Sequence, residues 1–296
     1  MSLFGILDRL ADVPSFDKVI EPVRSAVDKA LQPQAFKDLL HGSWLGHPVH
    51  PVLAMVPVGT WLSAGILDLT PPTRPAATAL IGTGVAASLP TALAGAADWS
   101  EQEIGVRRLG AVHAVANVAA LGLYIGSLVA RAKGRGGLGR ALSYTGLGIA
   151  GGSAAIGGHM SYAQSSGASH SAAAARTLTT DWIDLGPLDD LPDGRPAVRT
   201  GEGSGGAPVP LAVVRRGTRV DAFVGACTHL GGPLGEGTVE EVRGRTCVVC
   251  PWHGSAFDLE AGQPRRGPAA DPQVKLEVRY EAGRVFARLP GRHRQP

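Results

Sequence analysis

Two short segments in the last quarter of the chain combine thiols with imidazoles. The first holds Cys227 and His229 and the second holds Cys250 and His253, so the pattern is C-x-H, twenty residues, then C-x-x-H. Thiolates and neutral imidazoles are ligands for zinc and iron. Cys247 precedes Cys250 as C-x-x-C, which also suits a zinc knuckle or a redox dithiol. In a straight strand, residues three apart point to opposite faces, which predicts that Cys247 lies outside the ligand set.

The order of these residues along the chain differs from that of common metal motifs. A zinc finger would pair cysteine with cysteine and histidine with histidine, and a c-type haem signature would need histidine where Pro251 stands. With GGPL in the first segment and HGSAFD in the second, the pattern resembles the Rieske iron–sulfur family over about 110 residues. The resemblance implies a [2Fe–2S] cluster with Cys227 and Cys250 on one iron and His229 and His253 on the other. Zinc stays the alternative.

Four neighbouring positions bear on the redox potential that the resemblance implies. High-potential respiratory members carry two further cysteines, bridged to each other, where this chain has Gly232 and Trp252. Ser255 matches a serine whose hydroxyl donates to a cluster sulfide, whereas Phe257 stands where a tyrosine donor is often found. Imidazole ligands make the cluster less negative and raise its potential. We therefore expect an intermediate potential, closer to Rieske ferredoxins than to quinol-oxidising subunits.

Short strands are the elements that would position these segments. From residue 182 onward, pieces such as PLAVVRR, RVDAFVGA and KLEVRY alternate with Gly and Pro turns, which predicts an all-β domain over residues 181–290. A basic tail follows over 291–296. The Ser/Ala/Gly tract QSSGASHSAAAAR before the domain is typical of a linker, predicted over 166–180.

A different composition precedes this linker. Four apolar stretches of about 20 residues, the length that crosses a bilayer, lie at 51–69, 76–97, 109–130 and 141–163, with few internal charges. They predict a domain of four transmembrane helices over residues 44–165, so the fold class is an α membrane bundle followed by a C-terminal all-β domain. Residues 1–43 have apolar residues at helical spacing. They predict one or two amphipathic helices that either pack on the rest of the protein or lie at the membrane interface.

Ionisable residues near the ends of these stretches mark a second candidate site. The segment LGHPVHPVLAMVPVGTW, with Asp98 and His113 further on, resembles the membrane domain of unknown function 2231. Because the chain would cross four times, His47, His50, Asp98, His113 and His159 are predicted to share one leaflet with the all-β domain. These histidines could cap helices, bind a quinone or a non-haem metal, or hold a b-type haem, for which His50 and His113 are the preferred axial pair.

Together these features predict a membrane-anchored Rieske protein that carries single electrons to or from a redox partner protein or a quinone. It would be a component of an oxidoreductase system rather than a stand-alone enzyme. The alternatives are a subunit of a quinol oxidoreductase or oxygenase chain, and a redox sensor or scaffold.

A net charge of +3, small and scattered, argues against binding of nucleic acid. We expect an integral protein of a bacterial-type plasma membrane, in contact with lipid. The all-β domain should lie in the cytoplasm because no disulfide is needed. The oligomeric state is left open.

Overall fold

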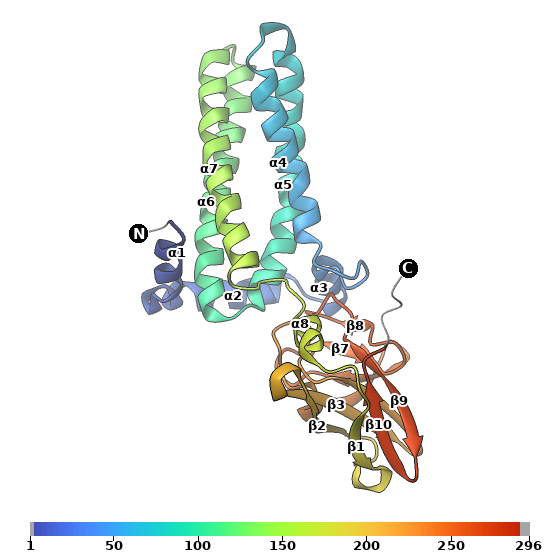
Figure 1. The fold of residues 1–296 in the computed structure, drawn as a ribbon. Coiled ribbons are helices and arrows are strands. Elements are labelled where there is room, and N and C mark those ends of the chain that lie inside the picture. The colour runs from blue at the N-terminus through green and yellow to red at the C-terminus, as the bar shows by residue number, and fades with distance from the viewer. Residues whose placement is uncertain (1–2, 291–296) are drawn as a thin grey trace, which may run out of the picture. The chain divides into compact units, whose positions relative to one another are not determined.

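The computed structural model describes residues 3–290 and divides the chain into two units. Residues Met1–Gln32 and Val49–Ser166 form a helical unit, whereas Pro33–Pro48 and Gly167–Pro296 form a second unit built mainly of strands. The tail predicted over residues 291–296 lies outside the described residues. The predicted fold class, a helical bundle followed by an all-β domain, is confirmed (Figure 1).

Four long helices run side by side in the helical unit, and each overlaps one predicted apolar stretch (Figure 1). They are α4 (His50–Leu67), α5 (Arg74–Ser100), α6 (Ile104–Ala132) and α7 (Gly136–Tyr162). Trp61 of α4 stacks on Tyr124 of α6 with 4.1 Å between ring centroids. Gly84 of α5 makes room for this pair, because a Cβ there would lie 2.2 Å from Trp61 Nε1. Aromatic stacking and small residues thus hold the middle of the bundle together.

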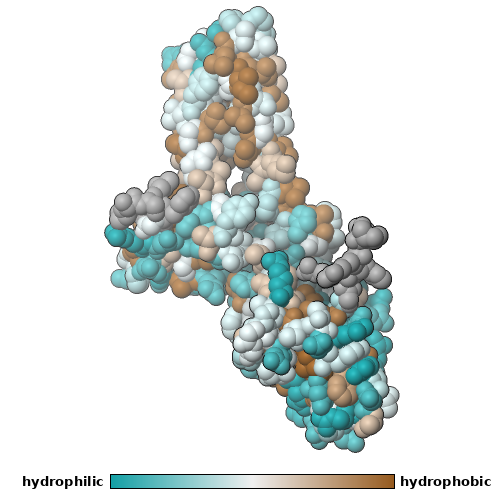
Figure 2. Space-filling view, in the orientation of Figure 1, coloured by the Kyte–Doolittle hydropathy of each residue, from teal (hydrophilic) through white to brown (hydrophobic). Residues whose placement is uncertain are grey.

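Much of the apolar surface of the bundle faces outward, as the brown areas along it show (Figure 2). Met55, Leu69, Val115 and Val118 each expose between 69% and 73% of their surface. Among the described residues, α4, α5 (taken from Pro71) and α6 are long and apolar enough to cross a membrane. At most 22% of the apolar window of any of them is buried. An apolar surface this extensive is unfavourable in water and suits lipid. The fourth predicted span, α7, is a helix of 27 residues, but its Gly and Ser content makes it less apolar.

The N-terminal segment forms two helices that pack on the bundle. These are α1 (Leu3–Ala11) and α2 (Asp17–Ala30). Leu7 is buried against Leu109 of α6. The carboxylate of Asp17 accepts two hydrogen bonds from Arg108, at 2.8 and 2.7 Å. These contacts favour the first of the two expectations, packing on the rest of the protein.

Two antiparallel sheets make up the second unit. The six-stranded sheet has the order β1-β10-β9-β4-β3-β2, and the four-stranded sheet has the order β5-β6-β7-β8. The strands are β1 (Ile183–Pro187), β2 (Pro196–Glu202), β3 (Pro208–Arg216), β4 (Arg219–Val224), β5 (Thr238–Val242), β6 (Arg245–Val249), β7 (Ala256–Asp258), β8 (Pro264–Arg266), β9 (Lys275–Glu281) and β10 (Arg284–Arg288).

Strand β3 is buried on both faces, which explains its unbroken apolar run. Leu211 and Val213 point into one cluster with residues of β4, β9 and β10. Ala212 and Val214 point into another cluster, shared with Val248 of β6 and residues of β7. Successive strand residues face opposite sides, so β3 contributes to both clusters. The second cluster contains residues of both sheets and therefore joins them. The segments with the paired thiols and imidazoles begin beside this cluster.

Two short helices outside the predicted all-β domain belong to the second unit. Helix α3 (Gln34–His41) falls within the predicted N-terminal segment, and α8 (His170–Thr177) falls within the predicted linker. The side chain of Ser169 caps α8 by accepting from Ala172 N at 3.2 Å. Ser171 and Ala175 are buried. A capped helix with a buried face differs from the flexible linker that the composition suggested.

Candidate metal centre

The two segments with paired ligands fold as loops with the same hydrogen-bond frame. In the first, Cys227 N donates to Gly232 O at 2.9 Å and Gly231 N donates to Cys227 O at 2.9 Å. In the second, Cys250 N donates to Ser255 O at 2.9 Å and Gly254 N donates to Cys250 O at 3.1 Å. The fourth residue after each cysteine is a glycine at positive φ, Gly231 at 74° and Gly254 at 72°. Each loop thereby presents a cysteine and then a histidine.

The loops bring like side chains together as two pairs. The thiols of Cys227 and Cys250 are hydrogen-bonded to each other and are 1% and 3% exposed. The imidazole rings of His229 and His253 lie edge to face, with 4.9 Å between centroids. Nowhere in residues 3–290 do three His, Cys, Asp or Glu side chains converge as a single ion would require. A thiol pair beside an imidazole pair instead suits a group with two metal atoms.

The surroundings favour the protonation states that bind metal. A hydrogen bond from Cys227, followed by the backbone N–H groups of Trp252 and His253, lowers the pKa of Cys250 to about 6. Burial, followed by the charges of nearby His253, His41 and His170, lowers the pKa of His229 to about 3. A thiolate and a neutral imidazole are the forms that coordinate metal.

Two further observations test whether these residues fit a [2Fe–2S] cluster. The Nδ1 atom of His229 is buried and has no hydrogen-bond partner within residues 3–290, which is costly unless it binds a metal. A Cβ at position 232 would lie 2.8 Å from Cys250 Sγ, so Gly232 keeps the space beside this sulfur free. The residues fit the cluster: Cys227 and Cys250 would hold one iron, and His229 and His253 the other.

Cys247 lies outside this group, as the strand alternation predicts. It is fully buried in β6 and packs with Val249 and Ala256, whereas Cys250 packs in the cluster that joins the two sheets. Burial, reinforced by nearby Asp258, raises the pKa of Cys247 to about 11. Its neutral thiol is a packing group rather than a ligand.

The neighbouring positions singled out in the sequence have defined contacts. Ser255 is fully buried, and its Oγ accepts from Ala269 N at 3.0 Å, so its own hydrogen can be donated elsewhere. Phe257 is fully buried and offers no donor. The indole of Trp252 lies over position 232, where a Cβ would be 3.1 Å from its ring. An indole and a glycine therefore meet where the resemblance places a disulfide in high-potential members.

Helix α3 supplies contacts that the sequence did not indicate. The carboxylate of Asp38 is 3% exposed and accepts from Gly267 N at 2.8 Å and from Arg243 Nη2 at 2.6 Å. His41 is 1% exposed and packs beside Gly267. Because Gly267 comes two residues before Ala269, which donates to Ser255, α3 supports the segment that covers the second ligand loop.

Helix α8 supports the first ligand loop in a similar way. His170 N donates to Thr228 O at 3.1 Å, between the two ligands of that loop. The buried side chain of Gln273 accepts from Thr228 N at 3.1 Å and donates to Ser171 Oγ at 2.9 Å. The Ser169 cap and the alanine run that follows it were the signal for this helix.

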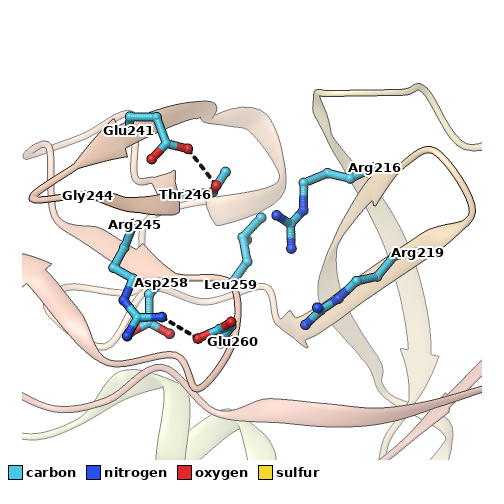
Figure 3. A pocket seen from close by; sticks show the side chains of 9 residues that line it. All are labelled: Arg216, Arg219, Glu241, Gly244, Arg245, Thr246, Asp258, Leu259 and Glu260. Atoms are coloured by element: carbon cyan, nitrogen blue, oxygen red, sulfur yellow. Dashed lines mark hydrogen bonds and ion pairs between the residues drawn. The ribbon is translucent and has the colours of Figure 1, made fainter.

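A separate hollow of about 200 Å³ in the same unit contains none of the four ligand residues (Figure 3). Several of its charged side chains are already in ion pairs: Arg245 with Glu260 of the same hollow at 2.5 Å, and Arg216 and Arg219 with Asp221, which lies outside the lining, at 3.0 and 3.3 Å. These pairs neutralise much of the charge that a ligand would need, so we assign no site there.

The histidines of the bundle are held by hydrogen bonds between helices. His113 Nδ1 lies 2.8 Å from Ser153 O, and His113 Nε2 lies 2.9 Å from Asn117 Nδ2. His50 Nδ1 lies 2.9 Å from Thr91 O. Since both ring nitrogens of His113 are engaged, none is left for an axial bond to iron. The predicted haem b between His50 and His113 is therefore not supported. The contacts of these histidines with Thr91 O and Ser153 O are made to the middles of neighbouring helices rather than to helix ends.

Comparison with known proteins agrees with both parts of this description. Residues 181–280 match the Rieske [2Fe-2S] domain family, and residues 46–175 match the family described as predicted membrane protein (DUF2231). Ferredoxin CarAc of Metapseudomonas resinovorans is 32% identical over 105 residues, which cover 36% of this chain and 91% of that protein. Apoptosis-inducing factor 3 of Homo sapiens is 39% identical over 62 residues, which cover 21% of this chain and only 10% of that protein.

Two solved structures are similar to part of the chain. The structure entitled complex of reduced oxygenase and oxidized ferredoxin in carbazole 1,9a-dioxygenase is 32% identical, with a TM-score of 0.32. The match covers 37% of this chain and 94% of that one. The ferredoxin of carbazole 1,9a-dioxygenase from Nocardioides aromaticivorans IC177 is 23% identical, covers 37% of this chain and 98% of that one, and has a TM-score of 0.32. The ligand pattern, the paired loops and the match across a whole ferredoxin agree: the chain belongs to the Rieske [2Fe–2S] family, through a ferredoxin-type domain that follows a DUF2231 membrane domain.

Proposed function

We propose that the protein is a membrane-anchored one-electron carrier. The observation that carries the proposal is the pairing of Cys227 with Cys250 and of His229 with His253 in a chain whose other unit exposes long apolar helices. When bound, a [2Fe–2S] cluster supplies one-electron exchange at a potential raised by its imidazole ligands. The protein residues hold the ligands, keep His229 neutral and exclude water from the two thiols.

The connections of the chain support four crossings of the membrane rather than three. Helix α3 precedes the bundle and α8 follows it, yet both belong to the second unit, where Asp38 bonds Gly267 and His170 bonds Thr228. Both ends of the segment from α4 to α7 must then lie on one side of the membrane. An even number of crossings requires α7 to span as well, despite its lower hydropathy.

The edge of the site that carries the histidines is where we propose electron exchange. Trp252 is 54% exposed, and its ring lies edge to face with that of His253, 6.4 Å between centroids. An exposed aromatic side chain beside a metal ligand is suited to a partner interface. By analogy with the carbazole dioxygenase ferredoxin, the partner would be an oxygenase or reductase component. Within the described residues, no contact at the bundle histidines favours a quinone.

We propose that this domain faces the cytoplasm. None of the three cysteines is joined in a disulfide, and a cluster domain without a disulfide suits a reducing compartment. The basic residues at the α4–α5 and α6–α7 turns favour the opposite orientation. Modification of an introduced surface cysteine, Tyr280→Cys, in intact cells by a membrane-impermeant thiol reagent distinguishes the two: protection supports the cytoplasmic side and labelling contradicts it.

Electron exchange by the full chain tests the function itself. Protein in lipid nanodiscs is reduced with dithionite and mixed with an oxidised one-electron acceptor while the visible spectrum is followed. We expect a one-electron titration at an intermediate potential. Trp252→Ala should slow the exchange without moving the potential. Iron-replete protein that takes up no electron, or purified protein that contains zinc in place of iron, would contradict the proposal.

A further inference from the structure

The turns at the end of the bundle drawn uppermost in Figure 1 carry an excess of basic residues. Between residues 68 and 74 and between 131 and 140 there are five basic side chains and one acidic one, Asp68. Asp68 is fully buried and forms a two-fold ion pair with Arg131. The single carboxylate of this end is thereby used by one arginine, and the other cations have no acidic neighbour along these turns.

A hollow of about 290 Å³ lies at this end, open to the outside. It is formed by the start of α5, the end of α6 and the start of α7. Arg131, held by Asp68 and also by Thr78 Oγ1 at 3.3 Å, forms one wall. Arg74 and Arg140, both half-buried, form the others.

These two arginines have no carboxylate partner among residues 3–290. The Nε atom of Arg74 is also buried without a hydrogen-bond partner in the described part of the chain. A buried donor left unpaired is costly, so the hollow is built to receive an acceptor. Gly136 opens α7 at the hollow, and the first N–H groups of a helix add positive potential there.

Apolar residues lie close to the hollow along the chain. Pro75 lines it, and Leu138 in the first turn of α7 and Leu69 just after α4 expose 49% and 73% of their surface. Guanidinium donors beside exposed aliphatic side chains, at the ends of helices with lipid-facing surfaces, match a phosphate that carries acyl chains.

We propose that Arg74 and Arg140 bind the phosphate of an anionic phospholipid headgroup. Arg131 is held by Asp68 as the fixed wall of this site. The site lies in the helical unit and does not depend on the cluster, so it can be tested independently of electron transfer.

The test uses the full chain, purified and delipidated in detergent, and measures retention of phosphatidylglycerol against phosphatidylcholine by native mass spectrometry. We expect the wild type to prefer phosphatidylglycerol by on the order of tenfold or more. The double variant Arg74→Gln/Arg140→Gln should lose this preference. The matched control Lys133→Gln/Arg135→Gln removes the same charge from exposed positions that do not line the hollow, and it should retain the preference.

Equal loss of preference in both double variants would overturn the proposal, because it would show diffuse attraction rather than a built site. Absence of any preference in the wild type would overturn it too. Inorganic phosphate serves as a competitor: no displacement of the lipid at millimolar phosphate supports a headgroup site, and full displacement with equal stabilisation of the protein shows a free-phosphate site instead. Circular dichroism of each variant confirms that the helices are intact.

Discussion

Replacement of Asp38 by alanine should weaken the Rieske unit although Asp38 lies more than 140 residues before that domain begins. The carboxylate accepts three hydrogen bonds, from Gly267 N at 2.8 Å, Gln34 Nε2 at 3.0 Å and Arg243 Nη2 at 2.6 Å. It is 3% exposed, whereas the side chain of Arg243 is 53% exposed. The variant therefore leaves the buried N–H of Gly267 without its acceptor and exposes the guanidinium of Arg243 to water.

These contacts determine how much unfolding free energy the Asp38→Ala variant loses. A buried donor without a partner costs about 1–3 kcal/mol. The half-exposed ion pair adds at most about 1 kcal/mol. We expect Asp38→Ala to lower the free energy of unfolding by roughly 1–4 kcal/mol, or the melting temperature of this unit by about 3–12 °C. Asp38→Asn keeps one acceptor oxygen for Gly267 and should cost about half as much.

Thermal bleaching of the visible cluster absorbance in the detergent-purified full chain measures this effect. Asp184→Ala is the matched control, because its carboxylate pairs with Arg284 but is 43% exposed, so solvent screens the pair and its loss should have little effect on stability. If Asp38→Ala shifts the bleaching midpoint no further than Asp184→Ala does, α3 is not part of the unit and the reasoning is refuted.

Three other predictions follow from single contacts. Ser255→Ala should lower the reduction potential by about 50 mV, because a donor worth about 1 kcal/mol to the reduced cluster is lost; potentiometric titration with an unchanged or raised potential contradicts this. Gly232→Ala should reduce iron per chain, measured by metal analysis, because its Cβ would lie 2.8 Å from Cys250 Sγ; full occupancy contradicts it. Burial acts to raise the pKa of Asp221, but Lys275 and Arg216 outweigh it and hold this pKa below its ordinary 3.8. The stabilisation from Asp221 is thus complete above pH 3.8 and is lost as the pH falls through the folded pKa. In Asp221→Asn, the melting temperature followed by circular dichroism should therefore fall less steeply as the pH is lowered.

The parts of this protein that follow local rules could be predicted from the sequence. The odd step between Cys247 and Cys250 separated the packing cysteine from the ligand, because side chains alternate along β6. The apolar stretches predicted the positions of the four long helices to within five residues at each end, because a segment long and apolar enough to cross a bilayer is marked by its composition.

The supports of the ligand loops could not be predicted, because they depend on contacts between distant parts of the chain. Asp38 and Gly267 are 229 residues apart in the sequence, and the segment between them includes the whole bundle. No residue near Asp38 in the sequence indicates that partner. Helix α8 was missed for a different reason: its Ser and Ala content is shared by linkers and by capped helices, and burial of Ser171 decides between them.

The haem prediction is left without support for a related reason. His50 and His113 do lie near each other, but pairing two histidines from sequence says nothing of their other contacts. Ser153 and Asn117 engage both nitrogens of His113, and neither residue stood out among the small polar side chains of the bundle.

Electron paramagnetic resonance of the dithionite-reduced full chain tests the central claim most directly. We predict a rhombic Rieske signal that disappears in His229→Ala and persists in Cys247→Ser. Among the described residues Nδ1 of His229 is buried without a hydrogen-bond partner and would bind iron, whereas Cys247 packs in β6 with Val249 and Ala256. A signal that survives His229→Ala, or no signal from iron-replete reduced protein, would contradict the assignment of the ligands and with it the proposed electron carrier.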